Sequence, residues 1–159
     1  MKALILLLVV VCVGCASSQK ETTSKETTEK PQPAKGEPAN IADPIVEKAI
    51  RKAVKKPAGE LTKADLEKVT RLVLEEDQLT EVPKGLENLT QLKWLELTGN
   101  QLTDVTGLEK LTQLTWLDLD ANQLTSVKGL EKHTQLEWLN LSNNKLTDVK
   151  GLENLTGLT

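Results

Sequence analysis

The sequence contains very few aromatic residues. Its 159 residues include three Trp and neither Phe nor Tyr. The only histidine is His133, and the only two cysteines, Cys12 and Cys15, fall among the first fifteen residues. The region after Cys15 therefore cannot form an internal disulfide or a zinc site built from Cys and His side chains. We expect no metal and no other cofactor.

An excess of positive charge is also lacking. The formal net charge is −3, which argues against a nucleic-acid-binding protein. The charge is unevenly distributed along the chain. Residues 44–68 contain seven Lys or Arg and four Asp or Glu, whereas residues 69–159 contain eight and fourteen. A mildly basic segment therefore precedes a mildly acidic one.

The sequence has no apolar run long enough to span a membrane as a helix. Its longest run, from Ala3 to Val13, is eleven residues and suits the core of a secretory signal. It ends in Val-Gly-Cys, which resembles the lipobox of bacterial lipoproteins. This resemblance implies that residues 1–14 are removed and that Cys15 carries the lipid. Cys12 stands where the lipobox usually has an aliphatic residue, so an ordinary signal peptide or an uncleaved anchor is the alternative.

The segment after Cys15 has almost no residues that could form a core. Thr, Glu, Lys and Pro dominate residues 16–40. Such a segment cannot bury enough apolar surface to offset the entropy lost on ordering. We therefore predict that residues 15–40 are a lipidated cysteine and a disordered tether, with a span of roughly 25–30 Å.

The remainder of the sequence is repetitive. Units of 22 residues begin at Leu92, Leu114 and Leu136, and a related unit of 23 residues begins at Val69. The 22-residue units share the pattern Leu-x-x-Leu-x-Leu-x-x-Asn-x-Leu. This pattern is the leucine-rich repeat signature, and its spacing resembles the internalin-type subclass of bacterial proteins. The resemblance covers residues 41–159 and implies an α/β fold, a leucine-rich repeat solenoid with a short curved parallel β-sheet and an N-terminal helical cap.

Elementary stereochemistry supports this interpretation. In a strand, Leu95 and Leu97 point to one face, while Trp94 and Glu96 point to the other. One repeat cannot bury its leucines alone, whereas stacked repeats form a continuous core. Asn side chains can satisfy the backbone where the chain turns inward after each strand. We expect this role for Asn100, Asn122 and Asn144, and for Asp77 in the first repeat.

His133 occupies a column that is otherwise filled by Leu89, Leu111 and Leu155. A catalytic or metal-binding role would need a second His or a Cys, and neither follows Cys15. We therefore expect His133 to be a partly exposed substitution on the convex side of the solenoid.

The segment ahead of the repeats has clear helix signals. Asp43 suits an N-cap before Pro44, and the apolar residues that follow lie on one stripe. Thr62 and Asp65 have capping-box spacing. The predicted organisation is a signal peptide (1–14), a lipidated Cys15 with a tether (15–40), a helical cap (41–68) and about four repeats (69–159).

No comparable C-terminal cap is evident in the sequence. An open solenoid end exposes a strand edge and apolar surface, which favours association. Two interpretations follow: self-association through this edge, or a fragment of a larger leucine-rich repeat surface protein.

All three tryptophans occupy one phase of the repeat, on the face opposite the leucines. Since neighbouring strands lie about 4.8 Å apart, we expect the rings to form one ladder on the concave sheet, with Arg71 at its end. Exposed aromatic surface often marks a binding site. The candidate partner-binding residues are Arg71, Trp94, Glu96, Thr98, Trp116, Asp118, Asp120, Trp138 and Asn140. The alternative is that the rings only stabilise the sheet.

The carboxylates beside the ladder are weak candidates for catalysis. We expect the face to be open to water, with nothing to shift a carboxyl pKa. The sequence shows no nucleophile with a base and no glycine-rich phosphate loop. We therefore predict a non-enzymatic module, anchored to the cell envelope through Cys15, that binds a protein or glycan partner in the periplasm or outside the cell. A self-associating structural envelope component is the alternative.

Overall fold

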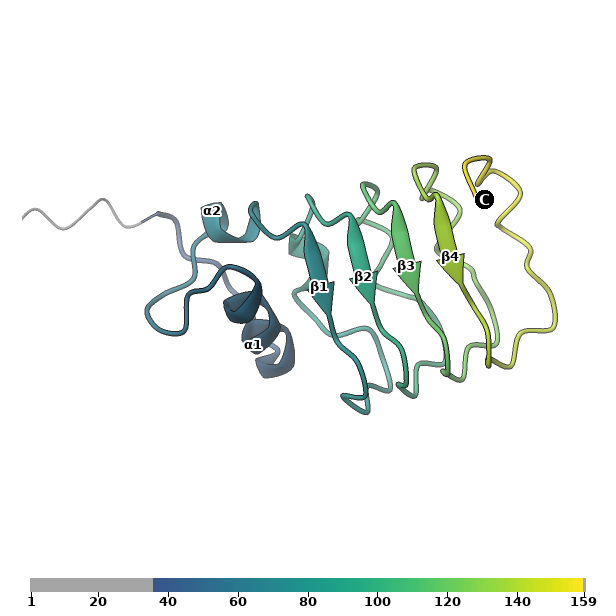
Figure 1. Cartoon of the computed structure of the whole chain (residues 1–159), viewed down its shortest axis with the longest axis horizontal. Helices are drawn as coiled ribbons and strands as arrows, with labels where there is room; N and C mark the ends of the chain where they lie inside the picture. Colours follow the sequence, from purple (N-terminus) through teal and green to yellow (C-terminus); the bar gives the residue numbers. More distant parts are fainter. Residues whose placement is uncertain (1–35, 159) are drawn as a thin grey trace, which may run out of the picture. The chain divides into compact units, whose positions relative to one another are not determined.

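The computed structural model describes residues 36–158, in which a helical cap precedes a parallel β-sheet (Figure 1). The predicted signal peptide and Cys15 lie outside the described residues. Within that range, no helix is long and apolar enough to cross a membrane. The elements are α1 (Pro44–Ala53), α2 (Lys63–Leu66), β1 (Arg71–Val73), the 3-10 helix η1 (Leu86–Asn88), β2 (Trp94–Glu96), β3 (Trp116–Asp118) and β4 (Trp138–Asn140).

The sheet follows the order of the sequence, β1-β2-β3-β4, and all pairs are parallel. Equivalent repeat positions lie opposite one another: Trp94 pairs with Trp116, and Trp116 with Trp138. Arg71 lies opposite Trp94. The repeat lengths, 23 residues for the first unit and 22 for the others, therefore set the register, as the sequence pattern predicts.

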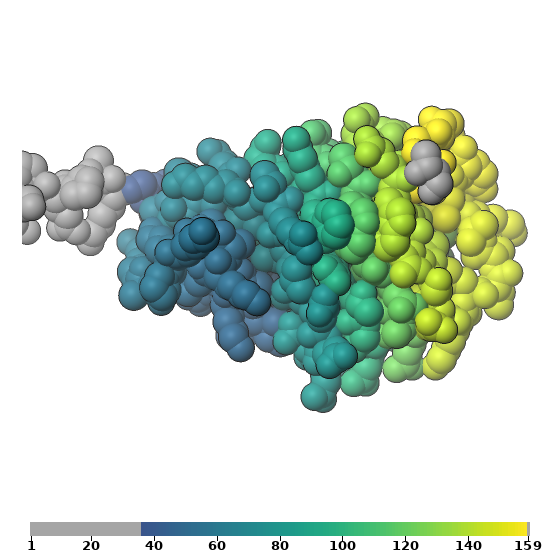
Figure 2. Space-filling model, in the orientation of Figure 1, coloured from purple at the N-terminus to yellow at the C-terminus, as the bar shows by residue number. Residues whose placement is uncertain are grey.

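The leucine columns form the core. Leu95, Leu97, Leu117 and Leu119 are completely buried. Figure 2 shows the successive repeats, coloured from teal to yellow, packed directly against one another. Burial falls off in the last repeat, where Leu139 is only partly buried. The core is thus shared between repeats, as expected for units that cannot bury a face alone.

The asparagines hold the turn after each strand. Asn122 Nδ2 donates to the carbonyl oxygens of Leu97 (2.9 Å) and Leu119 (3.1 Å), and its Oδ1 accepts from Leu102 N (3.1 Å). Asn100 and Asn144 make the equivalent bonds. This confirms their predicted role.

Asp77 does not share this role. In the described part of the chain it is exposed and makes none of the bonds that the asparagines make. A carboxylate has no N–H to donate to the two carbonyl groups, so it cannot replace the amide. The prediction for Asp77 was therefore wrong.

His133 was also predicted wrongly. The side chain is completely buried rather than partly exposed. Its Nε2 lies 3.1 Å from the Leu108 carbonyl oxygen of the preceding repeat, and its Nδ1 lies 3.3 Å from that of Leu130. The ring fills the leucine column and, unlike leucine, has an N–H group, which in the neutral ring can donate to one of these two carbonyl oxygens. Burial lowers the pKa of His133 below its ordinary value, so the neutral ring is favoured.

The cap is fixed by local hydrogen bonds. Asp43 Oδ1 accepts from Ile45 N at 2.8 Å and so caps α1, whose Val46 and Ile50 pack into the core. Thr62 and Asp65 form the predicted capping box at α2. These interactions place α1 beside β1, where it covers the first repeat (Figure 1).

A partly buried ion pair also joins two segments of the cap. The side chain of Asp65 is 12% exposed and lies 2.6 Å from Lys56 Nζ. The hydrogen bond from Lys56, together with those from Thr62, holds the pKa of Asp65 well below its usual range.

Residues 37–40, which the sequence assigned to the tether, lie against the cap. Pro38 forms an antiparallel bridge with Thr62, and Ala39 N donates to Leu61 O at 2.8 Å. Lys63 N donates to the carbonyl oxygen of Glu37 at 2.9 Å. This short segment is therefore continuous with the folded cap.

Candidate partner-binding face

The three indole rings form a continuous stack, which we call the tryptophan ladder (Trp94, Trp116 and Trp138). The first two ring centroids are 3.6 Å apart with planes 12° from parallel, and the next two are 4.3 Å apart with planes 3° from parallel. Both distances are shorter than the strand spacing of about 4.8 Å, so the rings lean into contact with one another. The predicted ladder is confirmed, and the rings are partly buried.

Arg71 covers one end of the ladder. Its Cζ lies 4.4 Å from the Trp94 ring centroid, within the range of a cation–π interaction. Its Nη2 also lies 3.8 Å from a carboxylate oxygen of Glu96. The Arg71 side chain remains 60% exposed, so both interactions leave it accessible to a partner.

Glu96 departs from the expectation that no carboxyl pKa is shifted on this face. A hydrogen bond with Glu75, burial and the repulsion between the two carboxyls together raise the pKa of Glu96. The Trp94 indole N–H and the Arg71 charge oppose this change. The Trp94 Nε1 is buried and has no partner with good hydrogen-bond geometry. The pKa is raised because Glu75, which follows β1, interacts with Glu96 at the end of β2.

The polar residues beside the other two rings also hold the backbone. Asp118 Oδ1 accepts from Asp120 N at 2.9 Å, and Asn140 Oδ1 accepts from Ser142 N at 3.0 Å. Asp120 accepts in turn from Asn143 Nδ2 at 2.8 Å. These are Asx turns at the strand ends. The sequence analysis missed this structural role, although the two-residue spacing is its usual signal.

Thr98 completes the predicted set, two positions beyond the end of β2. The side chain is half-buried, and its Oγ1 has no hydrogen-bond partner. The structure thus brings all nine predicted residues to one face. Within the described residues, no group of three or more His, Cys, Asp or Glu side chains could hold a metal ion.

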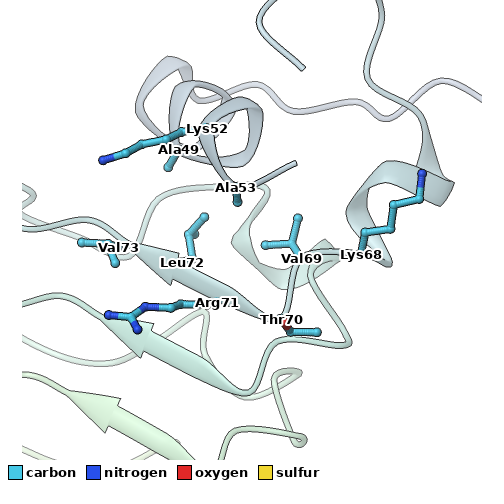
Figure 3. Close-up of a pocket in the computed structure, with 9 residues that line it drawn as sticks. All are labelled: Ala49, Lys52, Ala53, Lys68, Val69, Thr70, Arg71, Leu72 and Val73. Atoms are coloured by element: carbon cyan, nitrogen blue, oxygen red, sulfur yellow. The ribbon is translucent and has the colours of Figure 1, made fainter. Parts of the chain in front are cut away.

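A groove beside this face escaped the sequence analysis. It lies between α1 and β1 and encloses about 340 Å³ (Figure 3). It is lined by Ala49, Lys52, Ala53, Lys68, Val69, Thr70, Arg71, Leu72 and Val73. Its only sequence signal was the two Lys-Ala pairs of α1, at residues 48–49 and 52–53, and these pairs do not show which side of the helix meets the sheet.

Comparison with known proteins agrees with this geometry. Two family profiles, each described as leucine-rich repeat, match residues 67–124 and 135–157. A search of the curated proteins found no match.

Two similar solved structures are internalins of Listeria monocytogenes. One internalin is 31% identical, with a TM-score of 0.67, over 77% of this chain and 37% of its own. Internalin C2 is 32% identical, with a TM-score of 0.70, over 79% of this chain and 57% of its own. The chain therefore spans only about a third to a little over half the length of these relatives.

Proposed function

Because the chain is a leucine-rich repeat protein with an α/β solenoid fold, we propose that it binds a macromolecular partner through the tryptophan ladder and its polar flank. The observation that carries this proposal is the unbroken stack of three rings on the sheet face opposite the core. Trp is the residue type most enriched among binding hot spots. Repeat solenoids also present extended binding surfaces of this kind.

The stacking determines which part of each ring a partner can reach. The ring faces contact one another, so the ring edges point outward from the ladder. Indole edges carry partial positive charge and favour the face of another aromatic ring or an acceptor oxygen. The carboxylates of Glu96 and Asp118 lie beside these edges and favour a cation. We therefore propose a protein partner that combines aromatic and cationic side chains, with a glycan as the alternative.

Binding can be tested with the full chain and two triple variants. In the first, all three ladder tryptophans become Ala. In the matched control, Gln91, Gln113 and Gln135, which are exposed and recur at the same 22-residue interval, become Ala. Circular dichroism should show that both variants are folded.

We expect the parent and the glutamine variant to capture the same partner from envelope extract or from a glycan array. The tryptophan variant should lose that partner. Equal capture by all three proteins would mean that the ladder only stabilises the sheet.

We also propose that Cys15 carries a lipid that anchors the domain to the bacterial cell envelope, facing the periplasm or the exterior. The support is the apolar run that ends in Val-Gly-Cys, followed by a hydrophilic segment. Metabolic labelling with a fatty acid should modify the parent and a Cys12→Ser variant but not a Cys15→Ser variant. Equal labelling of both variants would contradict the assignment.

A further inference from the structure

The groove between α1 and β1 exists because of the way that α1 packs. Val46 and Ile50 enter the core, while Ala49 and Ala53 face the groove. Figure 3 shows these two alanines and Lys52 on α1, with Leu72 and Val73 on the neighbouring strand. Alanine side chains are too short to fill the space between helix and strand, so a recess of about 340 Å³ remains.

The groove is basic, although the repeats beside it are acidic. Lys52, Lys68 and Arg71 line it, and none of its nine lining residues is Asp or Glu. Electrostatic complementarity of this kind selects the charge of a binding partner.

These cations are available to a ligand. Among the described residues, Lys52 has no ion-pair partner. Lys68 lies 3.4 Å from Asp65, but Lys56 already binds that carboxylate at 2.6 Å. Arg71 is held only by its 3.8 Å pair with Glu96 and by its contact with Trp94.

The groove also offers apolar surface and free backbone groups. Val73 is 38% exposed, although it is a large hydrophobic residue on a strand. The backbone groups of Thr70 and Leu74 bond to β2. The backbone N–H and C=O groups of successive residues in a strand point to opposite sides of that strand. The backbone groups of Arg71 and Val73 therefore face away from β2, toward α1.

We propose that this groove binds an acidic peptide segment of a partner protein. An aliphatic side chain of the peptide packs on Ala49, Ala53 and Val73, and flanking carboxylates pair with Lys52, Lys68 and Arg71. A free phosphate would leave the apolar surface unused, and a flat lipid surface would not reach into the recess. This site goes beyond the proposed function because, Arg71 aside, it uses none of the residues assigned to the tryptophan ladder and its flank.

The probe for this proposal is the peptide Glu-Glu-Leu-Glu-Glu, titrated into the isotopically labelled full chain and followed by nuclear magnetic resonance. Backbone shifts should concentrate at Ala49, Lys52, Ala53 and Thr70–Val73. The Gln-Gln-Leu-Gln-Gln and Glu-Glu-Gly-Glu-Glu peptides should each bind more weakly, because one lacks the charges and the other the apolar side chain. Equal binding of the three peptides, or shifts confined to the repeats, would overturn the proposal.

Variants separate this groove from other surfaces. Combined Lys52→Glu and Lys68→Glu substitutions should weaken binding at least about tenfold, as expected for reversal of close charge pairs. Lys132→Glu, an exposed substitution in the repeats, should leave binding unchanged. Ala53→Leu, which fills the groove and keeps its charge, should also weaken binding. An equal loss in the Lys132 variant would contradict the assignment.

Two further measurements distinguish this proposal from other outcomes. A Trp116→Ala and Trp138→Ala variant should retain peptide binding, since neither ring lines the groove. This variant thus distinguishes loss of partner binding at the tryptophan ladder from loss of peptide binding in the groove. Capture of the parent chain, but not of the Lys52→Glu and Lys68→Glu variant, by vesicles containing anionic lipid, without peptide binding, would assign the basic surface to a membrane and overturn the peptide proposal.

Discussion

The cap and the repeats are stabilised in different ways. In the cap, single residues make unique interactions: Asp43 caps α1, and Asp65 joins a capping box to an ion pair. In the repeats, one residue type makes the same interaction in successive turns, as the leucine, asparagine and tryptophan columns show. We infer that replacing a cap residue destabilises only the structure around it. Replacing a repeat residue should also destabilise the repeats on either side.

The largest effect should come from a core leucine in the middle of the sheet. Leu117 is completely buried between β2 and β4. Leu117→Ala should lower the free energy of unfolding by about 2–5 kcal/mol, through lost burial and the cavity that remains. Val73→Ala, at a partly exposed position on β1, should cost less than about 1 kcal/mol. Urea unfolding measures both, and equal losses would contradict the shared-core interpretation.

A somewhat smaller effect should come from the asparagine column. Asn122→Ala removes the hydrogen bonds to Leu97 O, Leu119 O and Leu102 N in a buried turn. Leaving such groups unsatisfied should cost about 1–3 kcal/mol. Asp77→Ala, at the equivalent exposed position in the first repeat, should change stability by no more than about 0.5 kcal/mol. A large loss in the Asp77 variant would show that the two positions are equivalent after all.

The cap should respond more weakly to a single change. Asp43→Ala removes the N-cap of α1 and should cost about 1 kcal/mol. Asp43→Asn keeps an accepting oxygen and should retain most of the stability. Because the main strand contact of α1 is with β1, hydrogen exchange should speed up in α1 and β1 and remain unchanged in β3. Uniform acceleration across the sheet would contradict the local character of the cap.

The smallest effect should be a pH dependence due to His133. The folded state lowers its pKa below the ordinary value, so the unfolded chain binds the proton more readily. The contribution of the neutral ring should be fully present above pH ~6.5 and should decline as the pH falls below that value toward the folded-state pKa. His133→Leu should remove this dependence, measured as unfolding free energy against pH. The same slope in the variant would assign the dependence to other groups.

The sequence predicted most of what the repeat length determines. The register of β2 to β4, the leucine core and the tryptophan ladder follow from the 22-residue spacing, and the position of Arg71 follows from the 23-residue first unit. The helix N-caps at Asp43 and Thr62 were also predicted correctly, because each depends only on residues that are close in sequence.

The features that sequence analysis missed depend on contacts between segments. The buried ring of His133 lies beside two carbonyl groups, one of them in the preceding repeat. The raised pKa of Glu96 requires a second carboxyl, that of Glu75 in the segment after the neighbouring strand. The groove depends on which side of α1 faces β1. The apolar periodicity of the α1 sequence does not determine that orientation. Such contacts become visible only once the chain is folded.

The tryptophan ladder also determines how the protein interacts with light. The chain has no Phe or Tyr, so its near-ultraviolet absorption and emission come from three indole rings held face to face at 3.6 and 4.3 Å. Rings this close share their electronic excitation, so the signal reports their mutual geometry rather than three separate environments. A partner that touches the ladder or a slip in strand register would change this one spectrum. The protein therefore carries an intrinsic optical probe at the surface proposed for recognition.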